Sequence, residues 1–170
     1  MYIGIDLSTK TGIVQIGEHG KVQLAKEITS NKKDPERMIE IVESIMEIIK
    51  PNGKIAIEGF SYGSRGRGMS FQFGLGYALR IELCKRNIPF LIVTPSQVKK
   101  YATGKGNASK DNMILPIYKK WGFEHESDNV RDAFVLAKIA MAKDGKIEQQ
   151  LTAYESEVIK GVEIFIGEVE

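Results

Sequence analysis

The feature that most restricts the fold is the order in which strand-like and helix-like runs follow one another. Three short runs rich in β-forming residues come first, at residues 2–6, 12–17 and 21–28, separated by small polar residues or glycine. Their close spacing predicts an antiparallel meander. A helix should begin near Pro35, after Asp34, because the apolar residues that follow recur at helical spacing until a KPNGK segment ends the pattern.

Strands and helices alternate in the rest of the chain. The expected segments are strands at 54–58 and 89–93, a short helix opened by Thr94 and Pro95, helices near 70–86, 109–120 and 128–143, and Gly-rich loops at 59–70 and 103–109. This order predicts an α/β fold of three layers, with a mixed five-stranded sheet, in one domain over 1–145. The tail, 146–170, has mixed signals that predict no particular structure.

Composition narrows the class of protein. The 170 residues suit one ordinary domain, and their 42% hydrophobic and 27% charged shares are typical of soluble globular proteins. We expect no membrane span, because no apolar run approaches 18 uncharged residues. We also expect no secretory signal, since a strand-like run starts at residue 2 without a basic segment before it. The single cysteine, Cys84, cannot form an internal disulfide, which fits the reducing cytoplasm.

Positive charge is concentrated in the middle of the sequence. Residues 54–110 contain ten Lys or Arg and two acidic residues, a net charge of +8, whereas the remainder carries a net charge of −6. A basic region within a nearly neutral chain indicates a surface that binds a polyanion such as nucleic acid. Chance clustering on a solvated surface is the alternative.

Four carboxylates occupy positions from which they could hold metal ions. Asp6 ends the first predicted strand and Glu58 the fourth, while Asp128 and Asp132 lie four residues apart on one face of a predicted helix. If they converge, their mutual repulsion requires cations. Ligands that are all oxygen favour Mg²⁺ or Mn²⁺ over zinc, and two such ions can promote phosphodiester hydrolysis.

Each of these acids also has a purely structural interpretation. Asp6 could close a turn with Ser8 and Thr9, Glu58 could pair with an arginine at the surface, and Asp128 could be the N-cap of its helix. Asp132 is harder to explain in this way, because the apolar AFVLA run follows it directly.

Four blocks of sequence together resemble the RuvC-type Holliday junction resolvases. They are IGIDLSTKTG, AIEGF, TPSQVKKYATGKGNASK and DNVRDAFVLA, and they cover about residues 1–143 in order. The resemblance implies a ribonuclease-H-like fold and a Mg²⁺-dependent endonuclease that cuts branched DNA, four-way junctions above all. It also implies a homodimer, because resolving a junction takes two symmetric cuts. The apolar helix near 70–86 could supply the dimer contact or simply pack in the core.

The resemblance assigns the acids and the metal. Asp6, Glu58 and Asp132 match the family's catalytic acids, whereas its remaining acid usually lies three residues before the last, where this chain has Asn129. We expect Asp128 to substitute, with Asn129 as a weaker oxygen ligand. Two Mg²⁺ ions bridged by Asp6 would then occupy the site, and Mn²⁺ could replace them.

The resemblance also implies which residues meet DNA. Lys99 and Lys110 match basic positions near the scissile phosphate, where an ammonium offsets developing negative charge. Further contacts are expected from the basic and aromatic side chains of two Gly-rich loops: Phe60, Tyr62, Arg65, Arg67 and Lys105. The aromatic residues could instead belong to the core.

Three other functions fit parts of the sequence. The GIDLSTKTG block also resembles the first hairpin of sugar-kinase and actin-type ATP-binding domains, but those need two such domains and this chain supplies one. A ribonuclease-H-like enzyme that acts on RNA would share the acids. A structure-specific DNA-binding protein without activity would share the basic region.

Overall fold

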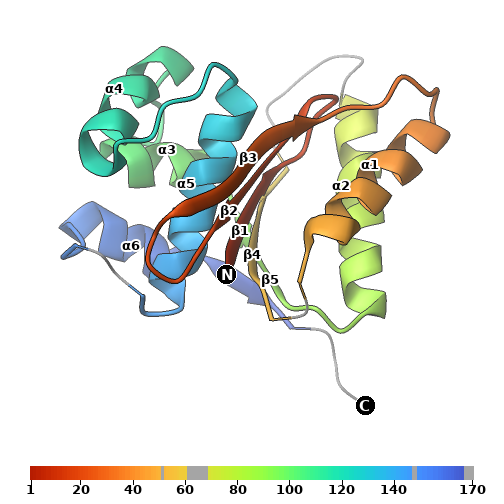
Figure 1. The fold of residues 1–170 in the computed structure, drawn as a ribbon. Helices are drawn as coiled ribbons and strands as arrows, with labels where there is room; N and C mark the ends of the chain where they lie inside the picture. The colour runs from red at the N-terminus through yellow and green to blue at the C-terminus, as the bar shows by residue number, and fades with distance from the viewer. Residues whose placement is uncertain (51, 61–68, 147–148, 167–170) are drawn as a thin grey trace.

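The computed structural model describes residues 1–50, 52–60, 69–146 and 149–166 and shows a mixed sheet with helices on both faces (Figure 1). The predicted three-layer α/β class is confirmed. The strand order is β3-β2-β1-β4-β5-β6. The first three strands form the expected antiparallel meander, β4 and β5 run parallel to β1, and β6 runs antiparallel to β5. The strands are β1 (Tyr2–Asp6), β2 (Thr11–Ile16), β3 (Val22–Ile28), β4 (Lys54–Glu58), β5 (Phe90–Val93) and β6 (Glu163–Phe165).

An apolar core lies between the sheet and the helices on each of its two faces. On one face lie α1 (Glu36–Ile48) and α2 (Met69–Lys85), which pack on side chains such as Ile3 and Ile5 of β1. On the other face α5 (Asp128–Lys143) lies against β1 and β2, and the surrounding helices are α3 (Pro95–Thr103), α4 (Lys110–Trp121) and α6 (Ala153–Gly161). None of the described helices is long and apolar enough to cross a membrane.

The close approach of α5 to the sheet depends on two glycines. A Cβ added to Gly4 would lie 1.9 Å from the carbonyl oxygen of Ala133, and one added to Gly12 would lie 2.1 Å from that of Asn129. Both neighbouring atoms belong to the helix backbone, so they cannot rotate away. Glycine in β1 and β2 therefore lets the first two turns of α5 rest directly on the sheet.

The tail, for which the sequence predicts no particular structure, contains α6 and β6 in its described part. The sheet consequently has six strands rather than the predicted five. Lys143 fixes this segment by donating hydrogen bonds from its Nζ to the carbonyl oxygens of Ile159 (2.7 Å) and Val162 (3.1 Å). The tail therefore completes the edge of the sheet next to β5.

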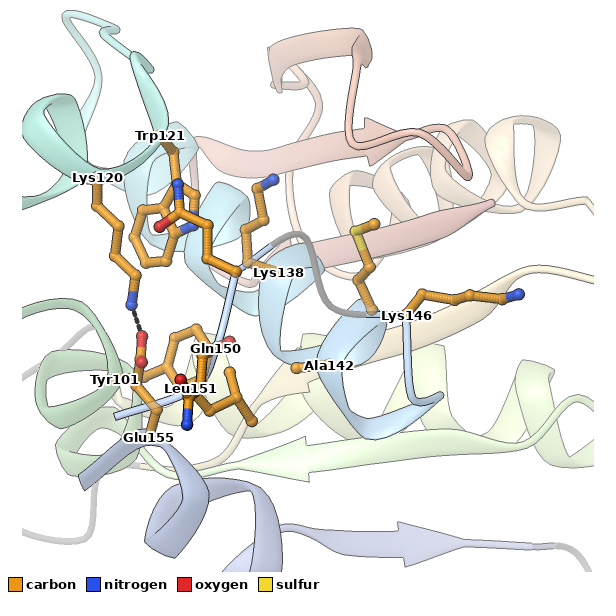
Figure 2. A pocket seen from close by; sticks show the side chains of 11 residues that line it. Tyr101, Lys120, Trp121, Lys138, Ala142, Lys146, Gln150, Leu151 and Glu155 are labelled. Atoms are coloured by element: carbon orange, nitrogen blue, oxygen red, sulfur yellow. Dashed lines mark ion pairs between the residues drawn. The ribbon is translucent and has the colours of Figure 1, made fainter. Parts of the chain in front are cut away.

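A buried ion pair also attaches the tail to α4. The Lys120 ammonium meets the Glu155 carboxylate beside Tyr101 and Trp121 (Figure 2). Burial and then the charge of Lys138 lower the pKa of Lys120 to about 8. Glu155 is fully buried, and its other oxygen accepts a hydrogen bond from the backbone N–H of Thr152 (2.8 Å). The pair thus joins α4 to α6 in a pocket that Lys138, Lys146 and Gln150 also line.

Glu155→Gln should lower the free energy of unfolding by about 3 kcal/mol, because it leaves a buried ammonium without its counter-charge. The glutamine oxygen can still accept from Thr152, so the capping contact is retained. Urea denaturation of the variant measures the loss. Lys120→Met added to Glu155→Gln should recover most of it, and a double variant as unstable as the single one would show that charge is not the cause.

Candidate active site

Asp6 and Glu58 lie side by side because their strands are adjacent and parallel. Ile5 of β1 is in register with Ile57 of β4, and the acids are the next residues of each strand. Their side chains are hydrogen-bonded to each other. Asp6 is only 5% exposed. Two carboxylates, the buried Asp6 and the half-buried Glu58, therefore lie together at the carboxyl ends of β1 and β4.

The third and fourth acids come from the first turns of α5. Ser127 caps this helix by accepting a hydrogen bond from the N–H of Val130 (3.3 Å), so Asp128 is not the N-cap. Asp128 is the first helical residue, and Asp132, which is 8% exposed, follows one turn later. Asp132 lies close enough to Asp6 that its negative charge raises the pKa of Asp6.

Contacts that have no signal in the sequence hold α5 in this position. The side-chain amide of Asn129 donates to the carbonyl oxygen of Lys10 (2.8 Å), which joins the helix to the β1–β2 turn. The Ser127 hydroxyl donates to the carboxylate of Glu27 on β3. The turn itself closes through a hydrogen bond from Thr11 to the carbonyl of Ser8, without Asp6. Asp6 therefore does not close this turn, which was its structural interpretation from the sequence.

The four acids have unequal electrostatic environments. Burial, followed by the charge of Asp132, raises the pKa of Asp6 to about 7. Burial and then the Asp6 charge also raise the pKa of Glu58, and burial raises that of Asp132. The pKa of Asp128 is lowered, first by its hydrogen bond with Lys110. The protein thus compensates negative charge on Asp6, Glu58 and Asp132 poorly, so these three acids hold protons more readily than free carboxyl groups do.

Lys110 contacts the two acids of α5, Asp128 and Asp132, which form the outer pair of the site. It is the first residue of α4, and its Nζ contacts Asp128 Oδ2 and lies 3.7 Å from Asp132 Oδ2. Burial lowers the pKa of Lys110, but the hydrogen bond to Asp128 and the carboxylate charges outweigh it and the net direction is upward. The contact therefore joins two helices, because α4 supplies the lysine and α5 supplies the acids.

The acids suit a hard divalent cation in their chemistry. Within the described residues, no group of three or more acidic, His or Cys side chains already surrounds a point that one ion could fill. The Asp6–Glu58 hydrogen bond and the Lys110 contact instead relieve the repulsion in pairs. Oxygen-only donors, burial and the raised pKa of three acids nevertheless match what Mg²⁺ or Mn²⁺ requires, so the residues fit such ions once the side chains rotate.

Known proteins resemble this chain in both sequence and structure. No family model matches it. The RuvC crossover junction endodeoxyribonuclease of Salinibacter ruber is 32% identical over 85 residues, which cover 49% of this chain and 48% of that protein. The RuvC crossover junction endodeoxyribonuclease of Prochlorococcus marinus is 24% identical over 135 residues, which cover 74% of this chain and 86% of that protein. The aligned segment thus spans about half of the Salinibacter protein.

Solved structures decide the fold. Thermus thermophilus RuvC in complex with a Holliday junction substrate superposes with a TM-score of 0.65 at 18% identity, over 85% of this chain and 93% of that chain. A second Thermus thermophilus RuvC structure gives a TM-score of 0.64 at 19% identity, over 85% and 96%. The fold is that of RuvC. The ribonuclease-H-like architecture and the resemblance to RuvC-type resolvases, predicted from four short blocks, are therefore confirmed.

Of the other residues matched to the RuvC pattern, Lys99 lies on the helix that follows β5. Glu58 is in register with Val93, after which Thr94 caps α3, the helix that carries the half-buried Lys99. Lys105 is exposed in the following loop. Within the part of the chain that the structure describes, neither lysine forms an ion pair with the acids. Tyr62, Arg65 and Arg67 lie outside the described residues.

Phe60 packs against α2. Its ring stacks on Phe73 with centroids 4.5 Å apart, and the Arg80 guanidinium lies 4.1 Å from its centroid. A Cβ on Gly76 would come within 2.5 Å of the ring. Of the two uses that the sequence left open for Phe60, packing is the one that these contacts display.

The raised pKa of Asp6 predicts how stability varies with pH. Between its ordinary value of 3.8 and the folded value of about 7, the folded chain binds more protons than the unfolded chain, so the free energy of unfolding should fall as pH rises through this window. The change should be about 1–4 kcal/mol. Urea denaturation at pH 5 and pH 8 without divalent ions measures it. Asp6→Asn should reduce the difference without abolishing it, because the raised pKa values of Glu58 and Asp132 contribute in the same direction. An unchanged pH dependence would contradict the assignment.

Proposed function

We propose that this chain is a divalent-metal-dependent DNA endonuclease that cuts four-way junctions. The observation that carries the proposal is the meeting of Asp6, Glu58 and Asp132, from β1, β4 and α5, beside Lys110. The likeness to RuvC proteins, whose names describe crossover junction endodeoxyribonucleases, supports it. So does the basic stretch 54–110, which contains the loops that follow β4 and α3.

Asp6, Glu58, Asp128 and Asp132 would hold the metal, for which we propose two Mg²⁺ ions that Mn²⁺ could replace. Such ions supply the positive charge and water activation that phosphodiester hydrolysis needs. Burial of Asp6 and Asp132 keeps competing water away from their oxygens. The protein would contribute a rigid base, because two parallel strands and one helix carry these acids.

Lys110 would stabilise charge on the DNA. Attack of a water oxygen on phosphorus breaks the bond to the 3′ oxygen, leaves a 5′-phosphate and a 3′-hydroxyl, and builds negative charge on the phosphoryl oxygens. An ammonium next to the acids can offset that charge. Lys99, Lys105 and the loop residues would bind the strands, together with Phe60 if its packing loosens. We place this activity in the cytoplasm of a bacterial or phage-infected cell.

The decisive experiment is incubation of purified protein with a labelled four-way junction, with and without Mg²⁺. Paired cuts that require Mg²⁺ support the proposal. A linear duplex and an RNA hybrid serve as comparison substrates, and preferential cutting of the RNA would favour the ribonuclease alternative. Junction binding without any cutting would favour a non-catalytic DNA-binding protein.

Two cuts in one junction need two active sites, so we propose a homodimer formed through α2. Phe71, Leu75 and Leu79 of this helix face the core. Tyr77 and Ile81, one turn apart, are 54% and 51% exposed. An outward apolar face of this kind is typical of a protein interface.

Ile81→Glu should convert the dimer to a monomer, because it places a charge in the centre of the proposed contact. We expect the dissociation constant to rise at least about a hundredfold, an effect of about 3 kcal/mol. Sedimentation velocity over a concentration series measures it. Leu115→Glu is the matched control, since Leu115 is 56% exposed on α4. An equal effect of both variants, or of neither, would contradict the α2 interface.

A further inference from the structure

Lys110 occupies the carboxylate oxygens that the proposed function gives to a metal ion. Its Nζ contacts Asp128 Oδ2 and lies 3.7 Å from Asp132 Oδ2. The Lys110 side chain is 48% exposed, and those of Asp128 and Asp132 are 41% and 11% exposed. The ammonium therefore approaches from the open side of the site and neutralises its outer half, whereas Asp6 and Glu58 bond to each other.

We propose that Lys110 is a tethered cation that competes with a divalent ion for Asp128 and Asp132. The inference rests on the proposed function, because it concerns the same acids. An oxygen in contact with the ammonium has less negative charge to offer a metal, and a second cation beside the ammonium is repelled by it. Ion binding at Asp128 and Asp132 hence requires the lysine side chain to withdraw, while binding at Asp6 and Glu58 does not.

Helix α4 is well placed to let the side chain withdraw. Lys110 lies in its first turn, after the N-cap Ser109, and the two residues after it, Asp111 and Asn112, are exposed. The long lysine stem can swing away from α5 without disturbing buried contacts of the helix, which involve Met113 and Ile117. A DNA phosphate at the site would offer the ammonium an alternative partner.

The consequence is that substrate and the outer ion favour each other. A phosphate that attracts Lys110 exposes Asp128 and Asp132, and an ion at those acids releases Lys110 toward the phosphate. Thermodynamic linkage makes the two effects equal. The chain would thus bind the outer ion mainly when DNA is present. Without DNA, Lys110 would neutralise Asp128 and Asp132 instead.

The test is isothermal titration calorimetry, which measures the affinity of the full chain for Mn²⁺ without DNA. Lys110→Met removes the charge and keeps most of the stem. The outer ion should then bind roughly tenfold more tightly, because its acids lose a competitor and the ion loses a repulsive neighbour. Lys110→Arg keeps the charge and should bind Mn²⁺ no more tightly than the original chain.

Lys119→Met is the matched control, because it removes the same charge from an exposed position of the same helix. It should change Mn²⁺ affinity by less than about twofold, since exposed and distant charges are screened. Equal Mn²⁺ affinity in the original chain and Lys110→Met, or tighter binding in Lys110→Arg, would overturn the competition. An original chain that binds no Mn²⁺ at all would overturn the proposed function as well.

A second measurement separates competition from a merely structural role. Without divalent ions Lys110→Met should melt at a lower temperature than the original chain, because Asp128 and Asp132 lose their counter-charge. Saturating Mn²⁺ should raise its melting temperature by more than it raises that of the original chain. A smaller rise in the variant would show that Lys110 supports the metal site and would overturn the proposal.

Discussion

Asp6→Asn should reduce cleavage of a four-way junction by roughly a thousandfold or more. Asp6 is the buried acid that touches Glu58 and feels the charge of Asp132, so it lies at the centre of the proposed ligand set. Asparagine has nearly the same shape but no charge, so it would hold divalent ions much more weakly. Single-turnover cleavage at saturating Mg²⁺ measures the effect.

The same variant should bind the junction about as tightly as the original chain, because removing a negative charge does not weaken contacts with phosphate. It should also unfold at a higher denaturant concentration at pH 8, since the buried charge behind the raised pKa of Asp6 is gone. Asp111→Asn, the same change at an exposed position of α4, is the control and should cut normally. Near-normal cutting by Asp6→Asn would contradict the metal assignment.

Gly4→Ala should destabilise the fold by about 4 kcal/mol or more, a size that only severe overpacking produces. The added methyl carbon would lie 1.9 Å from the carbonyl oxygen of Ala133 and 2.5 Å from the backbone nitrogen of Ala137. Both atoms belong to α5, so the helix must move away from β1. Because Asp132 precedes Ala133, the displacement also separates it from Asp6.

Urea denaturation measures this loss, and Mg²⁺-dependent cleavage should fall in whatever folded protein remains. Gly161→Ala is the matched control, because the same added carbon would meet only the side-chain nitrogen of Gln97, at 3.4 Å. It should change stability by less than about 1 kcal/mol. A Gly4→Ala chain of normal stability would mean that α5 does not rest on β1 as described.

Most elements can be predicted from the sequence because their signals are local. The alternation in KIAIE specifies β4 together with the position of Glu58 at its end, and YIGID does the same for β1 and Asp6. Helix α5 follows from its small apolar residues and from two acids four residues apart. Parallel pairing then brings strand ends together, so the convergence of Asp6 and Glu58 can be expected from the amino-acid sequence alone.

Other features depend on contacts between distant segments and leave no readable local pattern. The three residues of β6 form a strand because they pair with β5, and α6 is held by Lys120 and Lys143 from other helices. The contact of Lys110 with Asp128 joins two helices across a loop. The need for Gly4 appears only when α5 is in place. Tertiary packing, which a local pattern cannot encode, decides such features.

The most direct test of the central claim is a crystal structure of the chain grown with Mn²⁺, with an anomalous difference map that locates the ions. We predict a peak within coordination distance of Asp6 and Glu58. In crystals that also contain junction DNA we predict a second peak near Asp128 and Asp132, with Lys110 moved aside. Peaks elsewhere, or none at these acids, would contradict the proposal that they form the metal site of a nuclease.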